Sequence, residues 1–76
     1  MKLNEAIELG KEGHWQDAQI RISPGSLNHW FVMLRDTQYK FFVLADNEDL
    51  SITTDHINEL AQLIRSVGLK EFTVYL

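Results

Sequence analysis

HWFVMLR at residues 29–35 and YKFFVLA at residues 39–45 are two short segments that are apolar on both faces. Successive side chains of a strand point to opposite sides of the sheet, so a half-buried strand alternates apolar and polar residues. Neither segment alternates, since Trp30 and Val32 would lie on one face and Phe31 on the other. Strands of this kind need cover on both sides of the sheet. The remaining chain supplies cover for about one side, which predicts a partner surface.

The chain of 76 residues fits one small domain spanning residues 1–76, near the lower limit for a self-sufficient core. Cysteine is absent, which excludes disulfides and thiolate metal sites and is typical of a reducing compartment. Glu5 and Glu8 interrupt any apolar leader, and no apolar run approaches the roughly 20 residues that cross a bilayer. We therefore expect a cytoplasmic protein with no membrane partner.

Periodicity predicts two helices. A short helix would be capped by Asn4 and ended by Gly10 and Gly13. A second helix would be capped by a threonine at position 53 or 54 and would end at Gly68. Its buried stripe would consist of Ile57, Leu60, Ala61, Ile64 and Val67.

Four strands complete an αβββαβ order. The alternating residues 17–23 and the two apolar segments would form an antiparallel meander, and residues 71–76 would return parallel to the third strand. Because two-sided strands belong in the middle of a sheet, order 1-2-3-4 is favoured and order 4-1-2-3 is the alternative. Both helices then pack on one face, which gives an α+β two-layer sandwich.

The register of the hairpin formed by the two apolar segments stays open. A loop of two or four residues would place Arg35 opposite Lys40, a like-charge pair that is mildly unfavourable. A three-residue loop avoids this pair and would place Phe41 opposite Met33. The choice decides which large side chains share the uncovered face of the sheet.

Charge is spread unevenly along the chain. Residues 1–45 carry five acidic and five basic side chains, whereas residues 46–76 carry six acids against Arg65 and Lys70. Duplex nucleic acid is bound mainly through Lys and Arg, so we expect no nucleic-acid partner. An alternative function is an acidic inhibitor or nucleic-acid mimic that docks a basic protein through residues 46–59. Its acidic surface would consist of Asp46, Glu48, Asp49, Asp55 and Glu59.

A second alternative is catalytic. Histidine suits proton transfer near neutral pH, and His29 begins a strand after the turn at residues 24–26. The helix–strand–strand–strand–helix order is similar to that of double-stranded-RNA-binding domains and of small mRNA-cleaving toxins, where a histidine follows a glycine-rich turn. This resemblance implies an RNase-type toxin or hydrolase centred on His29. From the sequence alone, the candidate partners of this histidine are Ser26, Asp36 and Asp46. The basic residues of those families are replaced here by Thr53, Thr54, Asp55 and His56.

No motif predicts a cofactor or a metal. Asp46, Glu48 and Asp49 offer oxygen ligands, but the glycine and the closing glutamate of a calcium loop are absent. We therefore assign no catalytic residue and favour a protein that is not an enzyme. The leading hypothesis is an interaction module that acts as a homodimer, with another protein as a further possible partner. Its interface would draw on the hairpin and contain Trp30, Phe31, Met33, Phe42, Leu44 and Tyr75.

Overall fold

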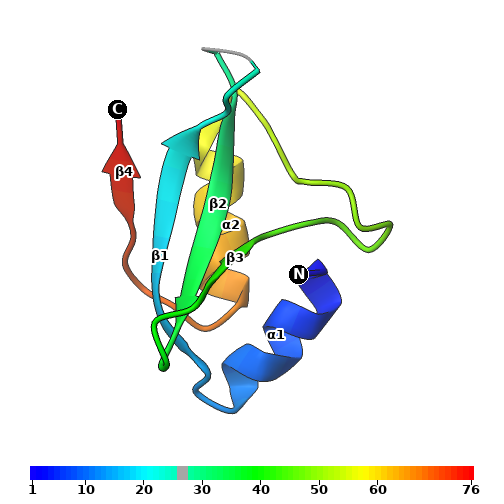
Figure 1. Cartoon of the computed structure of the whole chain (residues 1–76), viewed down its shortest axis with the longest axis vertical. Helices are drawn as coiled ribbons and strands as arrows, with labels where there is room; N and C mark the ends of the chain where they lie inside the picture. Colours follow the sequence, from blue (N-terminus) through cyan, green and yellow to red (C-terminus); the bar gives the residue numbers. More distant parts are fainter. Residues whose placement is uncertain (26–27) are drawn as a thin grey trace.

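The two apolar segments form the antiparallel strands β2 and β3, and the alternating segment forms β1 on the other side of β2 (Figure 1). The structure is a computed structural model that describes residues 1–25 and 28–76. Two helices and one four-stranded mixed sheet follow the predicted order, which confirms the α+β class. The elements are α1 (Leu3–Lys11), β1 (Trp15–Ile22), β2 (Trp30–Asp36), β3 (Phe41–Val43), α2 (Ile57–Ser66) and β4 (Thr73–Tyr75).

The favoured strand order is wrong and the alternative is observed, because the sheet runs β3-β2-β1-β4. β4 lies parallel to β1, with Val74 opposite Ile20. The N-terminal backbone meets the outer side of the chain at the end of β3, where Ala45 bridges Lys2 and its N–H donates to the Met1 carbonyl at 2.8 Å. β1 is therefore a central strand although one of its faces is polar. A polar row is compatible with a central position when that face of the sheet is not buried.

Both predicted N-terminal caps are also wrong. α1 follows Lys2 without a side-chain cap, and Asn4 lies inside the helix, where its Oδ1 accepts the backbone N–H of Glu5 at 2.9 Å. α2 follows His56, and Thr54 Oγ1 accepts the His56 N–H at 3.1 Å in the turn before the helix. These local side-chain bonds are the kind that compete with helix capping.

Two glycines end the helices as predicted. Gly13 and Gly68 have φ values of 73° and 95°, and the N–H of the residue after each bonds back into the last helical turn. Gly10 has a different role from the predicted one, because it lies within α1 and touches the end of α2. A Cβ added at Gly10 would lie 2.7 Å from the carbonyl carbon of Val67. The helices therefore meet backbone to backbone at this point.

The β2–β3 hairpin closes with a three-residue loop, residues 37–39, in which Tyr39 has a φ of 65°. The Asp36 N–H donates to the Lys40 carbonyl at 2.9 Å. The Asp36 carboxylate accepts the backbone N–H groups of Gln38 and Lys40 at 2.8 and 2.9 Å. This loop avoids the like-charge pair, but it sets Phe41 opposite Arg35, two residues further along β2 than the predicted partner Met33.

Both helices cover one face of the sheet. α2 lies behind the sheet in Figure 1, and α1 joins the same core through Ala6, whose carbonyl accepts the Trp15 Nε1–H at 2.9 Å. The Trp15 ring meets Phe42 edge-on, with ring centroids 5.8 Å apart. The predicted stripe of α2 is confirmed, because Leu60, Ile64 and Val67 are buried and Ile57 and Ala61 are half-buried. The largest fully buried side chains are Ile20, Val32, Leu34, Leu44, Leu60, Ile64 and Val67.

Candidate functional site

The face of the sheet opposite the helices is the most distinctive surface of the part of the chain that the structure describes. Strand register sorts its side chains into three rows that run across the strands. The middle row is Val43, Met33, Gln19 and Thr73, from β3 to β4. The row toward the β2–β3 loop is Phe41, Arg35 and Asp17, and the row on the other side is Phe31, Arg21 and Tyr75. We call this surface the open face.

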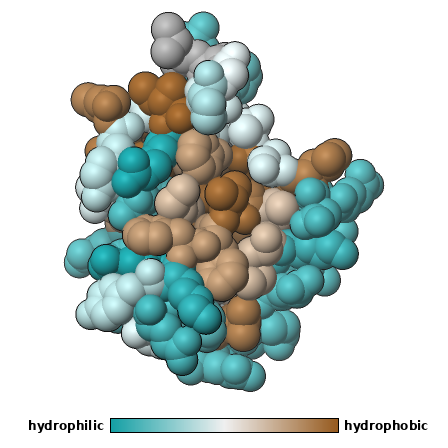
Figure 2. Space-filling view, viewed as in Figure 1, coloured by the Kyte–Doolittle hydropathy of each residue, from teal (hydrophilic) through white to brown (hydrophobic). Residues whose placement is uncertain are grey.

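An apolar patch occupies the β2–β3 half of the open face, and it consists of Phe31, Met33, Phe41 and Val43. Phe41 is 49% exposed and Val43 is 37% exposed, while Phe31 and Met33 are half-buried between their neighbours. Figure 2 shows hydrophobic side chains gathered over the middle of this face, with polar side chains around them. An apolar centre with a polar rim is typical of surfaces that bind a partner.

Polar side chains on β1 and at the end of β2 flank the patch, and both arginines among them have partners within the chain. Arg21 lies 4.2 Å from the centroid of the Tyr75 ring, and its Nε–H donates to Gln19 Oε1 at 2.9 Å. Arg35 forms an ion pair with Asp17, and its guanidinium lies 5.1 Å from the centroid of the Tyr39 ring. These contacts hold the arginines flat against the sheet, so the patch stays accessible.

A hollow of about 220 Å³ adjoins the patch at Phe31. Phe31 and Val43 form part of its lining, and its rim comes from the end of β1 and from the segment that returns beside β2. The lining residues are Ser23, Pro24, Phe31, Val43, Ser51 and Thr53. None of these is charged, so the hollow suits an apolar group.

The structure divides the predicted partner-binding residues between the two faces. Phe31, Met33 and Tyr75 lie on the open face. Trp30, Phe42 and Leu44 lie on the face that the helices cover, and Leu44 is fully buried there. These three side chains pack in or against the core, so they do not contribute to the open face.

Phe41 and Val43 are the residues that the sequence-based prediction missed. Their neighbours Phe42 and Leu44 are equally apolar, so composition alone did not separate the two pairs. The signal that separates them is loop length, because a three-residue loop puts Phe41 and Val43 on the same face as Met33. The sequence leaves the register open, and Phe42 and Leu44 share a face with Met33 only in the register of a two- or four-residue loop.

The structure separates His29 from Asp36, one of its candidate partners. His29 is exposed and precedes β2, while Asp36 ends that strand, about 20 Å away at the rise of an extended chain. Ser26 and Leu27 lie outside the described residues. Asp46 closes a turn in which its Oδ1 accepts the N–H groups of Glu48 and Leu50 at 2.9 and 3.0 Å.

A histidine–carboxylate pair does occur elsewhere. His14 Nε2 lies 3.7 Å from Asp36 Oδ2 at the base of the hairpin, where Asp36 is 4% exposed. The backbone N–H of Lys40 is the main cause that lowers the pKa of Asp36 below its usual value, while burial acts in the opposite direction. The Asp36 carboxylate accepts two backbone N–H groups of the turn and lies beside the half-buried His14. These contacts hold the turn in place, which indicates a structural role for Asp36.

The acidic residues form two groups. Asp46, Glu48 and Asp49 belong to the loop at the right of Figure 1, whereas Asp55 and Glu59 lie at the start of α2, behind the upper part of the sheet. Asp55 is paired with His56 at 3.3 Å, and Glu59 accepts the Thr54 hydroxyl at 3.2 Å. Residues 46–59 therefore do not present one acidic surface. Within the described residues no group of three His, Asp or Glu side chains is placed to hold a metal.

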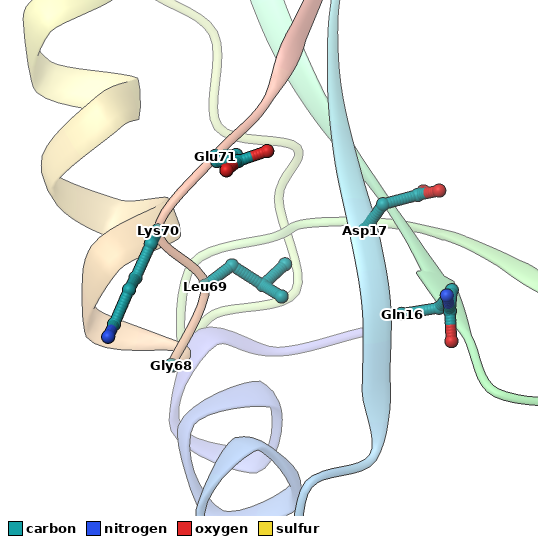
Figure 3. A pocket seen from close by; sticks show the side chains of 6 residues that line it. All are labelled: Gln16, Asp17, Gly68, Leu69, Lys70 and Glu71. Carbon is teal, nitrogen blue, oxygen red and sulfur yellow. The ribbon is translucent and has the colours of Figure 1, made fainter.

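A second hollow, of about 350 Å³, opens where β1 and the chain leading into β4 separate (Figure 3). Leu69 points into the gap toward β1, but Lys70 points away from it, and the Asp17 side chain lies on the far side of β1 (Figure 3). The charged groups do not converge on a common point. This hollow therefore lacks the arrangement of a catalytic or ligand site.

Comparison with known proteins adds no assignment. Neither helix of the described chain is long and apolar enough to cross a membrane. No family model, no curated protein and no solved structure matches this chain.

Proposed function

We propose that this protein is a protein–protein interaction module that associates with a second copy of itself through the open face. The observation that carries the proposal is the apolar patch of Phe31, Met33, Phe41 and Val43 on a face opposite both helices. Closed two-fold dimers are the commonest oligomers of soluble proteins. In such a dimer the patch of one copy meets the same patch of the other.

The size of the patch supports this arrangement. From the exposed fractions, the patch and Tyr75 together leave roughly 300–400 Å² of side-chain surface accessible. Burial of this area is worth about 8–10 kcal/mol per copy at 25 cal/mol per Å². Two copies together exceed the association cost of about 4–15 kcal/mol. The two copies together would bury roughly 600–800 Å² of this surface, and the polar rows around it add area toward the roughly 1,000 Å² that a specific interface needs.

The test is the solution mass of the wild-type protein and of Phe31→Asp, measured by sedimentation equilibrium up to about 1 mM. We expect a dimer for the wild type and a mass near 8.8 kDa for Phe31→Asp, because the variant loses the apolar contact of the ring and a carboxylate would have to leave water when the faces meet. Gln62→Asp is the matched control, since Gln62 is exposed on α2 and lies on the other layer. This control should remain dimeric.

Circular dichroism of each variant checks that the fold is retained. A wild-type protein that stays at 8.8 kDa over the whole concentration range would refute self-association. A folded Phe31→Asp variant that dimerises as tightly as the wild type would show that the copies meet elsewhere.

A further inference from the structure

We infer that the two copies meet in one register, with the two-fold axis across the strands along the row Val43, Met33, Gln19 and Thr73. This inference rests on the proposed function, because it specifies the geometry of that dimer. The central contact is Phe41 of each copy inserted into the hollow beside Phe31 of the other.

The row pattern leads to this register. A two-fold axis in the plane of the interface and perpendicular to the strands keeps each strand opposite its own copy but exchanges the two outer rows. Face-to-face sheets pack with their strands within about 30° of each other, so the rows remain in correspondence near the axis. Phe41 lies in one outer row and Phe31 with its hollow lies in the other. Exchange of the outer rows therefore places the Phe41 ring of one copy above the hollow beside Phe31 of the other copy.

Size and exposure agree with this fit. Phe41 is the most exposed member of the patch at 49%, and it lies near the β2–β3 loop, away from the hollow of its own copy. An apolar cavity of about 150 Å³ can hold a benzene-sized molecule, so a hollow of about 220 Å³ can accept a phenyl ring. Its uncharged lining leaves no buried charge unpaired when the ring enters.

Charge complementarity favours the same register. Asp17 belongs to the Phe41 row and Arg21 to the Phe31 row, both on β1. Exchange of the rows therefore places Asp17 of each copy opposite Arg21 of the other. Arg35 is placed in the same way over Phe31 of the other copy, where a guanidinium can stack on a ring. A two-fold axis along β2 would instead leave each outer row facing its own copy, with Arg35 toward Arg35.

The test uses two complementary variants. Phe41→Ser removes the protruding ring, and Ser51→Trp fills the hollow from an exposed position on its rim. Each variant alone should associate at least tenfold more weakly than the wild type. An equimolar mixture should form a mixed dimer, because Phe41 of the Ser51→Trp copy enters the intact hollow of the Phe41→Ser copy. At the other contact of the mixed dimer, the serine at position 41 of the Phe41→Ser copy faces the filled hollow of the Ser51→Trp copy, so no ring has to enter that hollow.

Native mass spectrometry distinguishes the mixed dimer from either homodimer, and sedimentation gives its dissociation constant. Leu50→Ser and Gln62→Trp are the matched controls, since both positions are exposed and lie outside the open face. They should dimerise as the wild type does. Thr53→Trp repeats the filling of the hollow if Ser51→Trp is not folded by circular dichroism.

Recovery of the mixed dimer supports the register. A wild type that dimerises while the mixture remains monomeric, or while Phe41→Ser alone dimerises normally, overturns the register and leaves the proposed function standing. A monomeric wild type overturns both.

Discussion

Replacing Gly10 by alanine tests the contact between the two helices. In an isolated helix this change is favourable by about 1 kcal/mol, because alanine has the higher helix propensity. Here the added Cβ would lie 2.7 Å from the carbonyl carbon of Val67, closer than any real contact of this kind. Overpacking of a rigid site costs about 1–3 kcal/mol, and backbone cannot rotate away as a side chain does. The cost should therefore be at the upper end of this range, about 3 kcal/mol, and the net loss after the gain in helix propensity about 2 kcal/mol.

Urea unfolding followed by tryptophan fluorescence measures this loss at a fixed protein concentration, with the buried Trp15 as reporter. For a domain of this size, 2 kcal/mol corresponds to a fall in Tm of roughly 8–16 °C. Gly25→Ala is the control, because a Cβ there meets no atom within 4 Å and should change stability by less than about 0.5 kcal/mol. If Gly10→Ala were as stable as the wild type, the close approach of the helices would be refuted.

Two further predictions concern the core and the hairpin. Leu60→Ala should lower the free energy of unfolding by about 2–5 kcal/mol, because a fully buried side chain is replaced by a cavity; a loss below 0.5 kcal/mol in urea would show that α2 is not packed there. The lowered pKa of Asp36, caused first by the Lys40 N–H, means that its carboxylate contributes stability above pH 3.8 that is lost as the pH falls toward the folded-state pKa. Asp36→Asn should therefore flatten the dependence of unfolding free energy on pH below about 4, and an unchanged slope would assign that dependence to other groups.

Local patterns were sufficient to predict the elements and their order. The stripe on α2 and the alternation in β1 depend on residues close in sequence, and the glycines that end the helices act within one turn. The strand order was not predictable in this way. It depends on which strand has a free side for β4, and the outer side of β3 meets the N-terminal backbone at Val43 and Ala45.

The side of the sheet on which each hairpin residue lies could not be predicted, for a related reason. A shift of one residue in register moves every side chain to the opposite side of the sheet. Four consecutive apolar residues, at positions 41–44, fit either register equally well. The decision was made by Asp36, whose carboxylate holds the N–H groups of the loop. A loop contact of a single side chain thus selected the residues of the candidate site.

The two edges of the sheet bear on whether association stops. An exposed, long edge strand recruits further strands one after another, and this addition has no natural end. On one side, the N-terminal backbone already uses the outward groups at the end of β3, since the Met1 amino group donates to the Val43 carbonyl and the Met1 carbonyl accepts the Ala45 N–H. On the other side, β4 is only three residues long. Neither edge of the part of the chain that the structure describes therefore offers a long template for the growth of a fibril. Face-to-face docking of two copies, in contrast, covers the open face of both and leaves none for a third copy. Crowding this protein should yield discrete particles and not fibres.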